Sequence, residues 1–137
     1  MQAIKRDIYL NRLIERKENG AIKVITGIRR CGKSYLLFNL YYDYLLSCGI
    51  GKDRIIKIAL DDEEAENLTD AKTLAAFIKE RLKDENTYYV FLDEIQFVKD
   101  FEKVLNSLNR LPNLDIYVTG SNSKFLSSDI LTEFRGR

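Results

Sequence analysis

The feature that most constrains the fold of this chain is a glycine-rich loop between a short apolar strand and a long helix. Residues 27–34 read GIRRCGKS, which fits the pattern G-x-x-x-x-G-K-[ST]. Before the loop, AIKVIT is rich in β-branched residues, as in a buried strand. After it, KSYLLFNLYYDYLL repeats apolar residues at three- and four-residue steps, as in a helix. A strand, such a loop and a helix in direct succession are typical of a phosphate-binding loop.

The spacing of this loop suits phosphate chemistry. Glycines allow successive backbone N–H groups to curl around a phosphate, and the start of a helix favours an anion. We expect Lys33 to reach the β- and γ-phosphates and the Ser34 hydroxyl to bind Mg²⁺. The residues expected to contact the nucleotide are Gly27, Arg29, Arg30, Cys31, Gly32, Lys33, Ser34 and Tyr35. For Cys31 we favour the alternative that it is a small filler residue in the loop. For at least one of the two arginines we favour the alternative of a solvated side chain.

The rest of the chain alternates strands with helices. Strands are expected over 21–26, 54–60, 88–92 and 114–119, helices over 4–18, 33–47, 69–82 and 101–111, and short helical turns over 123–134. Strands separated by helices of this length predict βαβ crossovers and a parallel sheet. The expected fold class is therefore α/β, a three-layer αβα P-loop NTPase with a mostly parallel sheet.

Two adjacent acids follow the most apolar strand. YYVFL leads directly into Asp93 and Glu94, which places both at the carboxyl edge of the predicted sheet, beside the loop. We expect Asp93 to hold Mg²⁺ through water and Glu94 to orient and polarise the attacking water. The alternative is a solvated Asp-Glu pair. One strand and one helix lie between the loop helix and the acids, which leaves room for a strand inserted between the loop strand and the acid strand. That order is typical of ATPases with a catalytic glutamate, and the sequence has no Asn-Lys-x-Asp motif of the GTPase kind.

Two other polar segments are candidates for contacts with ligands. The strand over 114–119 is followed by Gly-Ser-Asn-Ser, from which Asn122, and after it Ser121, is expected to reach the γ-phosphate and position the water. The alternative, which we weigh equally, is that these residues cap a helix. For the acidic run over 61–64 we favour a solvated loop, and a metal or partner site is the alternative.

Composition excludes several other functions. The chain has no His, so catalysis and metal binding that depend on His are excluded, and two cysteines cannot build a four-thiolate zinc site. So few cysteines suit the cytoplasm. With 22 Lys and Arg against 21 Asp and Glu, the net charge of +1 gives no support for nucleic-acid binding. No apolar run is long enough for a membrane helix.

Four motifs in order resemble a known family. TGIRRCGKS, YYVFLDEIQ, VTGSNSKFL and the closing EFRGR are together similar to bacterial and archaeal AAA-type predicted ATPases, over essentially the whole chain from RDIYLNRL onward. The resemblance implies an AAA-like P-loop core that binds ATP with Mg²⁺. Lys33 and Ser34 match its Walker A residues, and Asp93 and Glu94 match its Walker B residues. Asn122, or Ser121, matches the sensor. Arg137, with Arg135 close by, matches an arginine that serves the γ-phosphate or a neighbouring active site, which implies a possible homo-oligomer.

Members of that family continue for a few hundred residues, with another sheet strand, a winged-helix-like segment and a nuclease-like domain. We therefore expect residues 1–137 to be the P-loop ATP-binding domain at the start of a longer protein. We also expect its sheet to lack the last strand, which would leave the strand over 21–26 with an unpaired edge.

Three functions are compatible with the sequence. The first is Mg²⁺-dependent ATP binding with ATP hydrolysis. The second is a nucleotide-binding or protein-interaction module without turnover of its own. The third is a nucleotide or small-molecule kinase, which we rank last because no arginine-rich lid segment is evident. ATP and ADP are the expected ligands, and a nucleic-acid partner would depend on a domain outside this chain.

Overall fold

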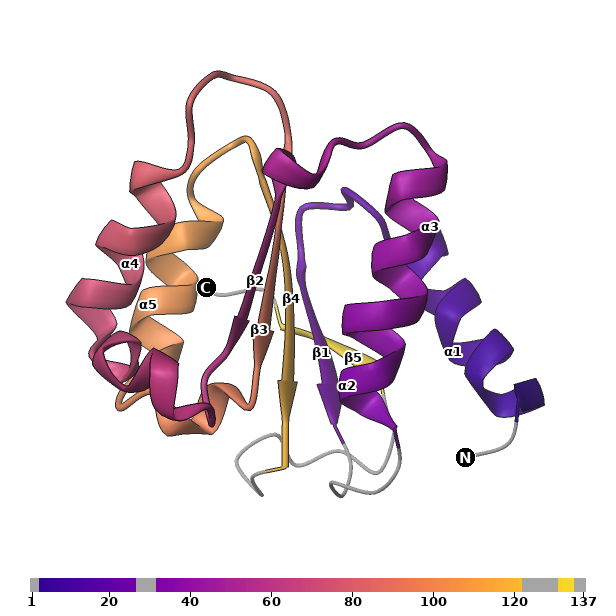
Figure 1. Cartoon of the computed structure of the whole chain (residues 1–137), viewed down its shortest axis with the longest axis horizontal. Helices are drawn as coiled ribbons and strands as arrows, with labels where there is room; N and C mark the ends of the chain where they lie inside the picture. Colours follow the sequence, from indigo (N-terminus) through magenta and orange to yellow (C-terminus); the bar gives the residue numbers. More distant parts are fainter. Residues whose placement is uncertain (1–2, 27–31, 122–130, 135–137) are drawn as a thin grey trace.

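A computed structural model of the chain describes residues 3–26, 32–121 and 131–134. In these residues a five-stranded sheet, in the order β2-β3-β4-β1-β5, lies between two layers of helices (Figure 1). The strands are β1 (Ile22–Thr26), β2 (Ile55–Ala59), β3 (Tyr88–Asp93), β4 (Leu114–Gly120) and β5 (Leu131–Phe134). The first four run parallel to one another, so the expected α/β class with a mostly parallel sheet is confirmed.

The helices cover both faces of the sheet. Figure 1 shows α4 and α5 on one face and α1, α2 and α3 on the other. Their bounds are α1 (Ala3–Glu15), α2 (Lys33–Tyr35), α3 (Tyr42–Ser47), α4 (Ala71–Glu80) and α5 (Phe101–Asn109). A π-helical segment, Leu36–Tyr41, joins α2 to α3, so the helix expected over 33–47 is continuous but wider in its middle turns. No helix of the described residues combines the length and the apolar character that crossing a membrane requires.

The strand inserted between the loop strand and the acid strand is β4. It pairs with β1 on one side and with β3 on the other, although it follows both in sequence. The strand that lies between them in sequence, β2, is at the edge of the sheet and pairs with β3. The expected insertion is therefore present, and the carboxyl ends of β1, β4 and β3 lie side by side.

The predictions for the end of the chain were wrong over residues 131–134. These residues form a strand rather than helical turns, and β5 pairs antiparallel with β1, with Ile22 opposite Phe134 and Ile25 opposite Leu131. The edge of β1 that we expected to be unpaired is therefore covered. The physical reason is that a strand edge presents free N–H and C=O groups, and pairing with β5 provides partners for them.

The acidic run over 61–64 is exposed, in agreement with the solvated loop that we favoured, but it is not a plain loop. Its second half begins a 3-10 helix, η4 (Glu63–Thr69), and the Asp62 side chain accepts a hydrogen bond of 3.0 Å from the backbone N–H of Glu64. The run thus also caps a short helix.

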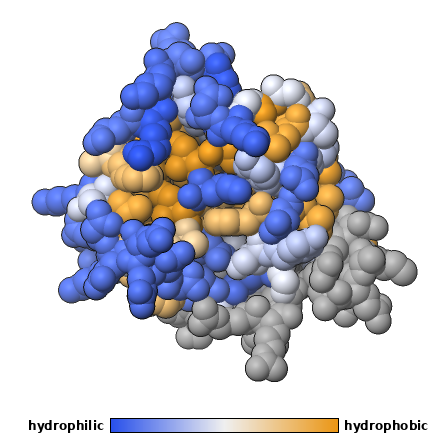
Figure 2. All heavy atoms as spheres, viewed as in Figure 1, coloured by the Kyte–Doolittle hydropathy of each residue, from blue (hydrophilic) through white to orange (hydrophobic). Residues whose placement is uncertain are grey.

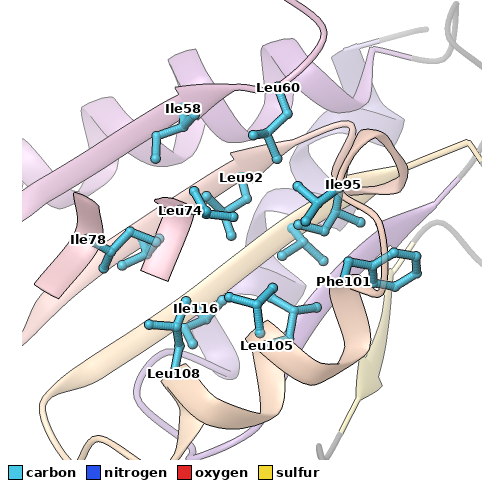
Figure 3. Packing of buried hydrophobic residues seen from close by; sticks show 14 of the residues in the cluster. Ile58, Leu60, Leu74, Ile78, Leu92, Ile95, Phe101, Leu105, Leu108 and Ile116 are labelled. Atoms are coloured by element: carbon cyan, nitrogen blue, oxygen red, sulfur yellow. The ribbon is translucent and has the colours of Figure 1, made fainter. Parts of the chain in front are cut away.

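The core consists of two apolar layers, one on each face of the sheet. Figure 3 shows the layer under α4 and α5, where Leu74, Ile78, Leu105 and Leu108 pack near Leu92 and Ile116 of the sheet. The layer under α1, α2 and α3 contains Leu13, Leu37, Tyr41, Phe91 and Tyr117. Because successive strand residues face opposite sides, Phe91 and Leu92 belong to different layers. Burial on both faces explains why β3 is apolar throughout until its last residue.

Candidate nucleotide-binding site

The first half of the candidate site is the start of the helix that follows β1. Gly32 has a φ of 81°, a left-handed conformation that favours glycine, and the helix begins at the next residue, Lys33. The Lys33 side chain is only 1% exposed. The other loop residues expected to contact the nucleotide, Gly27, Arg29, Arg30 and Cys31, lie outside the described residues. Tyr35 is described, and its side chain is 46% exposed at the surface of α2.

The second half of the site is the end of β3. Asp93 is the last residue of the strand, and Glu94 has φ 58° and ψ 59°, which is also left-handed. A non-glycine residue in this region costs roughly 1–2 kcal/mol, and such strain tends to occur at functional sites. The turn at Glu94 gives the two adjacent carboxylates different partners, Ser34 for Asp93 and Lys33 for Glu94.

Asp93 is held by two hydroxyl groups. The Ser34 Oγ donates to Asp93 Oδ1 and Oδ2 at 2.8 and 2.9 Å, and the Thr119 Oγ1 donates to Asp93 Oδ1. Burial raises the pKa of Asp93, and the two hydroxyl hydrogen bonds offset this only in part, so the pKa lies above its ordinary value. The same Thr119 Oγ1 accepts a hydrogen bond of 2.9 Å from the Glu94 N–H and so fixes both acids to β4.

Glu94 is ion-paired with Lys33. The Lys33 Nζ lies 2.8 Å from Glu94 Oε2, and the two side chains are 1% and 4% exposed. The other oxygen, Oε1, accepts hydrogen bonds from Gln96 Nε2 at 2.7 Å and Ser121 Oγ at 3.2 Å. Burial alone would raise the pKa of Glu94, but the hydrogen bonds from Lys33 and Gln96 and the charge of Lys33 outweigh burial and hold the pKa below its ordinary value.

The structure thus brings together Lys33, Ser34, Asp93, Glu94 and Ser121. Asn122, Arg135 and Arg137, the other expected sensor and arginine positions, lie outside the described residues. Sequence reasoning missed Thr119 and Gln96. Their signals are weak: a single Thr at the end of an apolar strand, and a Gln two residues after Glu94.

The oxygen atoms around Ser34 and Asp93 fit Mg²⁺. One hydroxyl and one nearly buried carboxylate lie in direct contact, and both are hard oxygen donors. Mg²⁺ characteristically takes one or two such ligands and completes its shell with water and substrate phosphates. The donor set therefore suits Mg²⁺ bound together with a phosphate group.

Two surface hollows lie along the edge strand β2. Their volumes are 460 and 430 Å³, and both are lined by Lys57 and Phe77. Lys33, Ser34, Asp93 and Glu94 line neither of them. Figure 2 shows that the face seen in Figure 1 carries a band of apolar side chains bordered by hydrophilic ones.

Known proteins resemble this chain over most of its length. A family model described as an AAA domain matches residues 19–137. The chain is 39% identical to an uncharacterized protein of Haemophilus influenzae, covering 98% of this chain and 34% of the relative. It is 38% identical to an uncharacterized protein of Methanocaldococcus jannaschii, covering 99% and 28%. The chain therefore spans about a third of the length of these curated relatives.

Solved structures show the same fold. A chain in the structure of Drosophila ORC bound to AT-rich DNA and Cdc6 has a TM-score of 0.56 and 13% identity, over 90% of this chain and 49% of that chain. A chain in a structure of Drosophila ORC bound to DNA has a TM-score of 0.55 and 11% identity, over 90% and 82%. Because the family model matches well over half of the chain, this chain belongs to the AAA domain family of P-loop nucleotide-binding proteins.

Proposed function

We propose that this domain binds ATP with Mg²⁺ and hydrolyses it. The observation that carries the proposal is the convergence of two motifs that are distant in sequence. Lys33 contacts Glu94 at 2.8 Å, and Ser34 contacts Asp93 at the same distance, at the carboxyl edge of the sheet. Each pair joins a residue of the glycine-rich loop to an acid at the end of β3.

The residues would divide the work as follows. Lys33 binds the β- and γ-phosphates, and Ser34 and Asp93 hold Mg²⁺, which neutralises phosphate charge when bound. Glu94 orients the attacking water and accepts its proton. The proposed loop contacts are Gly27, Arg29, Arg30, Cys31, Gly32 and Tyr35. Asn122 or Ser121 is the proposed sensor, and Arg137 the proposed arginine for the γ-phosphate or a neighbouring site.

A nucleotide switch without turnover is the second candidate, and one observation favours it. Lys33 and Glu94 are paired with each other in this structure. While the pair is intact, Lys33 is not available to bind phosphate and Glu94 is not available to activate water. If the domain cannot separate the pair fully when ATP binds, it would hold nucleotide without hydrolysing it.

The activity of the whole protein is a further proposal, because the chain spans about a third of its relatives. We propose a cytoplasmic protein that forms homo-oligomers, in which the ATP site drives a task performed by other domains. The two solved structures contain DNA, but a net charge of +1 does not support DNA binding by this domain itself.

Calorimetric titration with ATP and ADP, with and without Mg²⁺, tests binding. We expect wild type to bind Mg²⁺-ATP and Lys33→Ala to lose binding. A phosphate-release assay on the same wild-type sample then separates the candidates. Release of phosphate supports the ATPase, binding without release supports the switch, and absence of binding would contradict both.

A further inference from the structure

Gln96 makes two polar contacts that the proposed chemistry does not yet use. Gln96 is the middle residue of the short 3-10 turn η5 (Ile95–Phe97), which begins directly after Glu94. The Nε2 donates to Glu94 Oε1 at 2.7 Å, and the Oε1 accepts a 3.4 Å hydrogen bond from the backbone N–H of Ser121. One amide therefore connects the carboxylate of Glu94 with the segment that follows β4.

The two oxygens of Glu94 have different kinds of partner. Oε2 is bound to Lys33, which is charged and which ATP phosphates would attract. Oε1 is bound to Gln96 and Ser121, which are neutral. When phosphate takes Lys33, Oε2 loses its partner and becomes available to a water molecule, whereas Oε1 keeps both of its hydrogen bonds.

We propose that Gln96 is a positioning residue that holds Glu94 through Oε1 and leaves Oε2 as the atom that accepts the proton of the attacking water. This inference rests on the proposed ATPase function. Without Gln96, Glu94 would keep only the longer hydrogen bond to Ser121 once Lys33 had left. A misplacement of about 1 Å can cost about 100-fold in rate, so a weak hold on Glu94 would lower turnover.

The neutral character of Gln96 is part of its role. A lysine or arginine at this position would compete for the carboxylate and lower its capacity to accept a proton. An amide holds the carboxylate by a hydrogen bond without adding a positive charge. Because Gln96 also accepts from the Ser121 N–H, the ends of β3 and β4 together set the position of Glu94.

The experiment compares Gln96→Met and Gln96→Glu with wild type. Methionine has a similar length but removes both hydrogen bonds, and glutamate keeps the shape but places a second negative charge beside Oε1. For each protein we measure kcat at saturating Mg²⁺-ATP, the Kd for ATP by calorimetry, and the thermal unfolding midpoint. We expect kcat to fall about 10- to 100-fold in Gln96→Met, with the Kd for ATP within about two-fold of wild type, and kcat to fall further in Gln96→Glu.

Two results would overturn the inference. An unchanged kcat in both Gln96 variants would show that Glu94 needs no such support. A rise in the Kd for ATP of Gln96→Met with kcat unchanged would show that Gln96 acts in ground-state nucleotide binding and not on Glu94. If Gln96→Met has a lower unfolding midpoint, the kcat of Gln96→Glu decides whether Gln96 supports Glu94. Glu94→Gln separates this inference from the role of Glu94 on which it rests: turnover that survives Glu94→Gln overturns that role, whereas turnover lost in Glu94→Gln but kept in both Gln96 variants overturns only the role of Gln96. Absence of turnover in wild type that binds ATP would overturn the proposed hydrolysis itself.

Discussion

The Lys33 Nζ and Glu94 Oε2 lie 2.8 Å apart in the interior, although 61 residues separate them in the sequence. Both side chains are almost completely shielded from solvent. In the proposed reaction Lys33 binds phosphate and Glu94 binds water, so the ion pair has to open before either residue can act. Nucleotide binding therefore includes the cost of separating two buried charges.

This cost predicts that Glu94→Gln strengthens ATP binding. The substitution releases Lys33 from its charged partner and removes a negative charge near the expected phosphates. We expect the Kd for ATP to fall about 3- to 10-fold, which corresponds to about 1 kcal/mol, in a calorimetric titration. Glu63→Gln removes the same charge at an exposed position and serves as the matched control. An equal or higher Kd in Glu94→Gln would contradict the idea that the pair opposes binding.

A second buried ion pair lies at the other end of the sheet. The Lys23 Nζ of β1 lies 2.6 Å from Asp115 Oδ1 of β4, with side chains 0% and 3% exposed. The Asp115 Oδ2 also accepts from the Tyr117 hydroxyl and the Glu18 N–H at 2.6 and 2.9 Å. Lys23→Met leaves this carboxylate buried without its cation, and we expect a loss of about 3 kcal/mol in the free energy of unfolding, measured with urea.

The control for this variant is Lys99→Met, at an exposed lysine, which should change stability by less than about 0.5 kcal/mol. Because Lys23 lies near the amino end of β1, ATP affinity should be the same in Lys23→Met as in wild type at a temperature where both are folded. A stability loss no greater than that of Lys99→Met would show that the buried pair does not contribute.

The loop before β1 should make stability dependent on pH. The Glu18 carboxylate accepts hydrogen bonds from Lys17 Nζ at 2.8 Å and from the Tyr89 hydroxyl at 2.7 Å, and these bonds lower the pKa of Glu18 in the folded state despite partial burial. A lowered folded pKa means that the contribution is fully present above the unfolded pKa and is lost as pH falls through the folded pKa. The advantage of wild type over Glu18→Gln in urea unfolding should therefore be larger near pH 7 than near about pH 3. A difference that stays constant across this range would contradict the assignment.

Local patterns were sufficient to predict the elements that build the site. The strands β1, β3 and β4 follow from runs of apolar and β-branched residues, and the positions of Lys33, Ser34, Asp93 and Glu94 follow from motifs of adjacent residues. Their closeness in space could be expected because the carboxyl ends of neighbouring parallel strands meet at one edge of a sheet.

The remaining features depend on long-range pairing. β5 has only four residues, and its extended form goes with pairing to the edge of β1, which sequence pattern alone does not reveal. The contacts of Gln96 and Thr119 depend on the left-handed turn at Glu94, and the pairing of Lys33 with Glu94 depends on how deeply both side chains are buried. None of these pairings and contacts can be derived from residue type and spacing.

Single-turnover hydrolysis tests the central claim most directly. Wild type and Glu94→Gln, each in excess over ATP labelled at the γ-phosphate and supplied with Mg²⁺, are followed for release of labelled phosphate, and binding of the label is measured in the same samples. We predict that both proteins bind ATP and that only wild type releases phosphate, with the rate in Glu94→Gln lower by about 100-fold or more. Equal rates of release in the two proteins would contradict the assignment of Glu94 and the proposed ATPase mechanism.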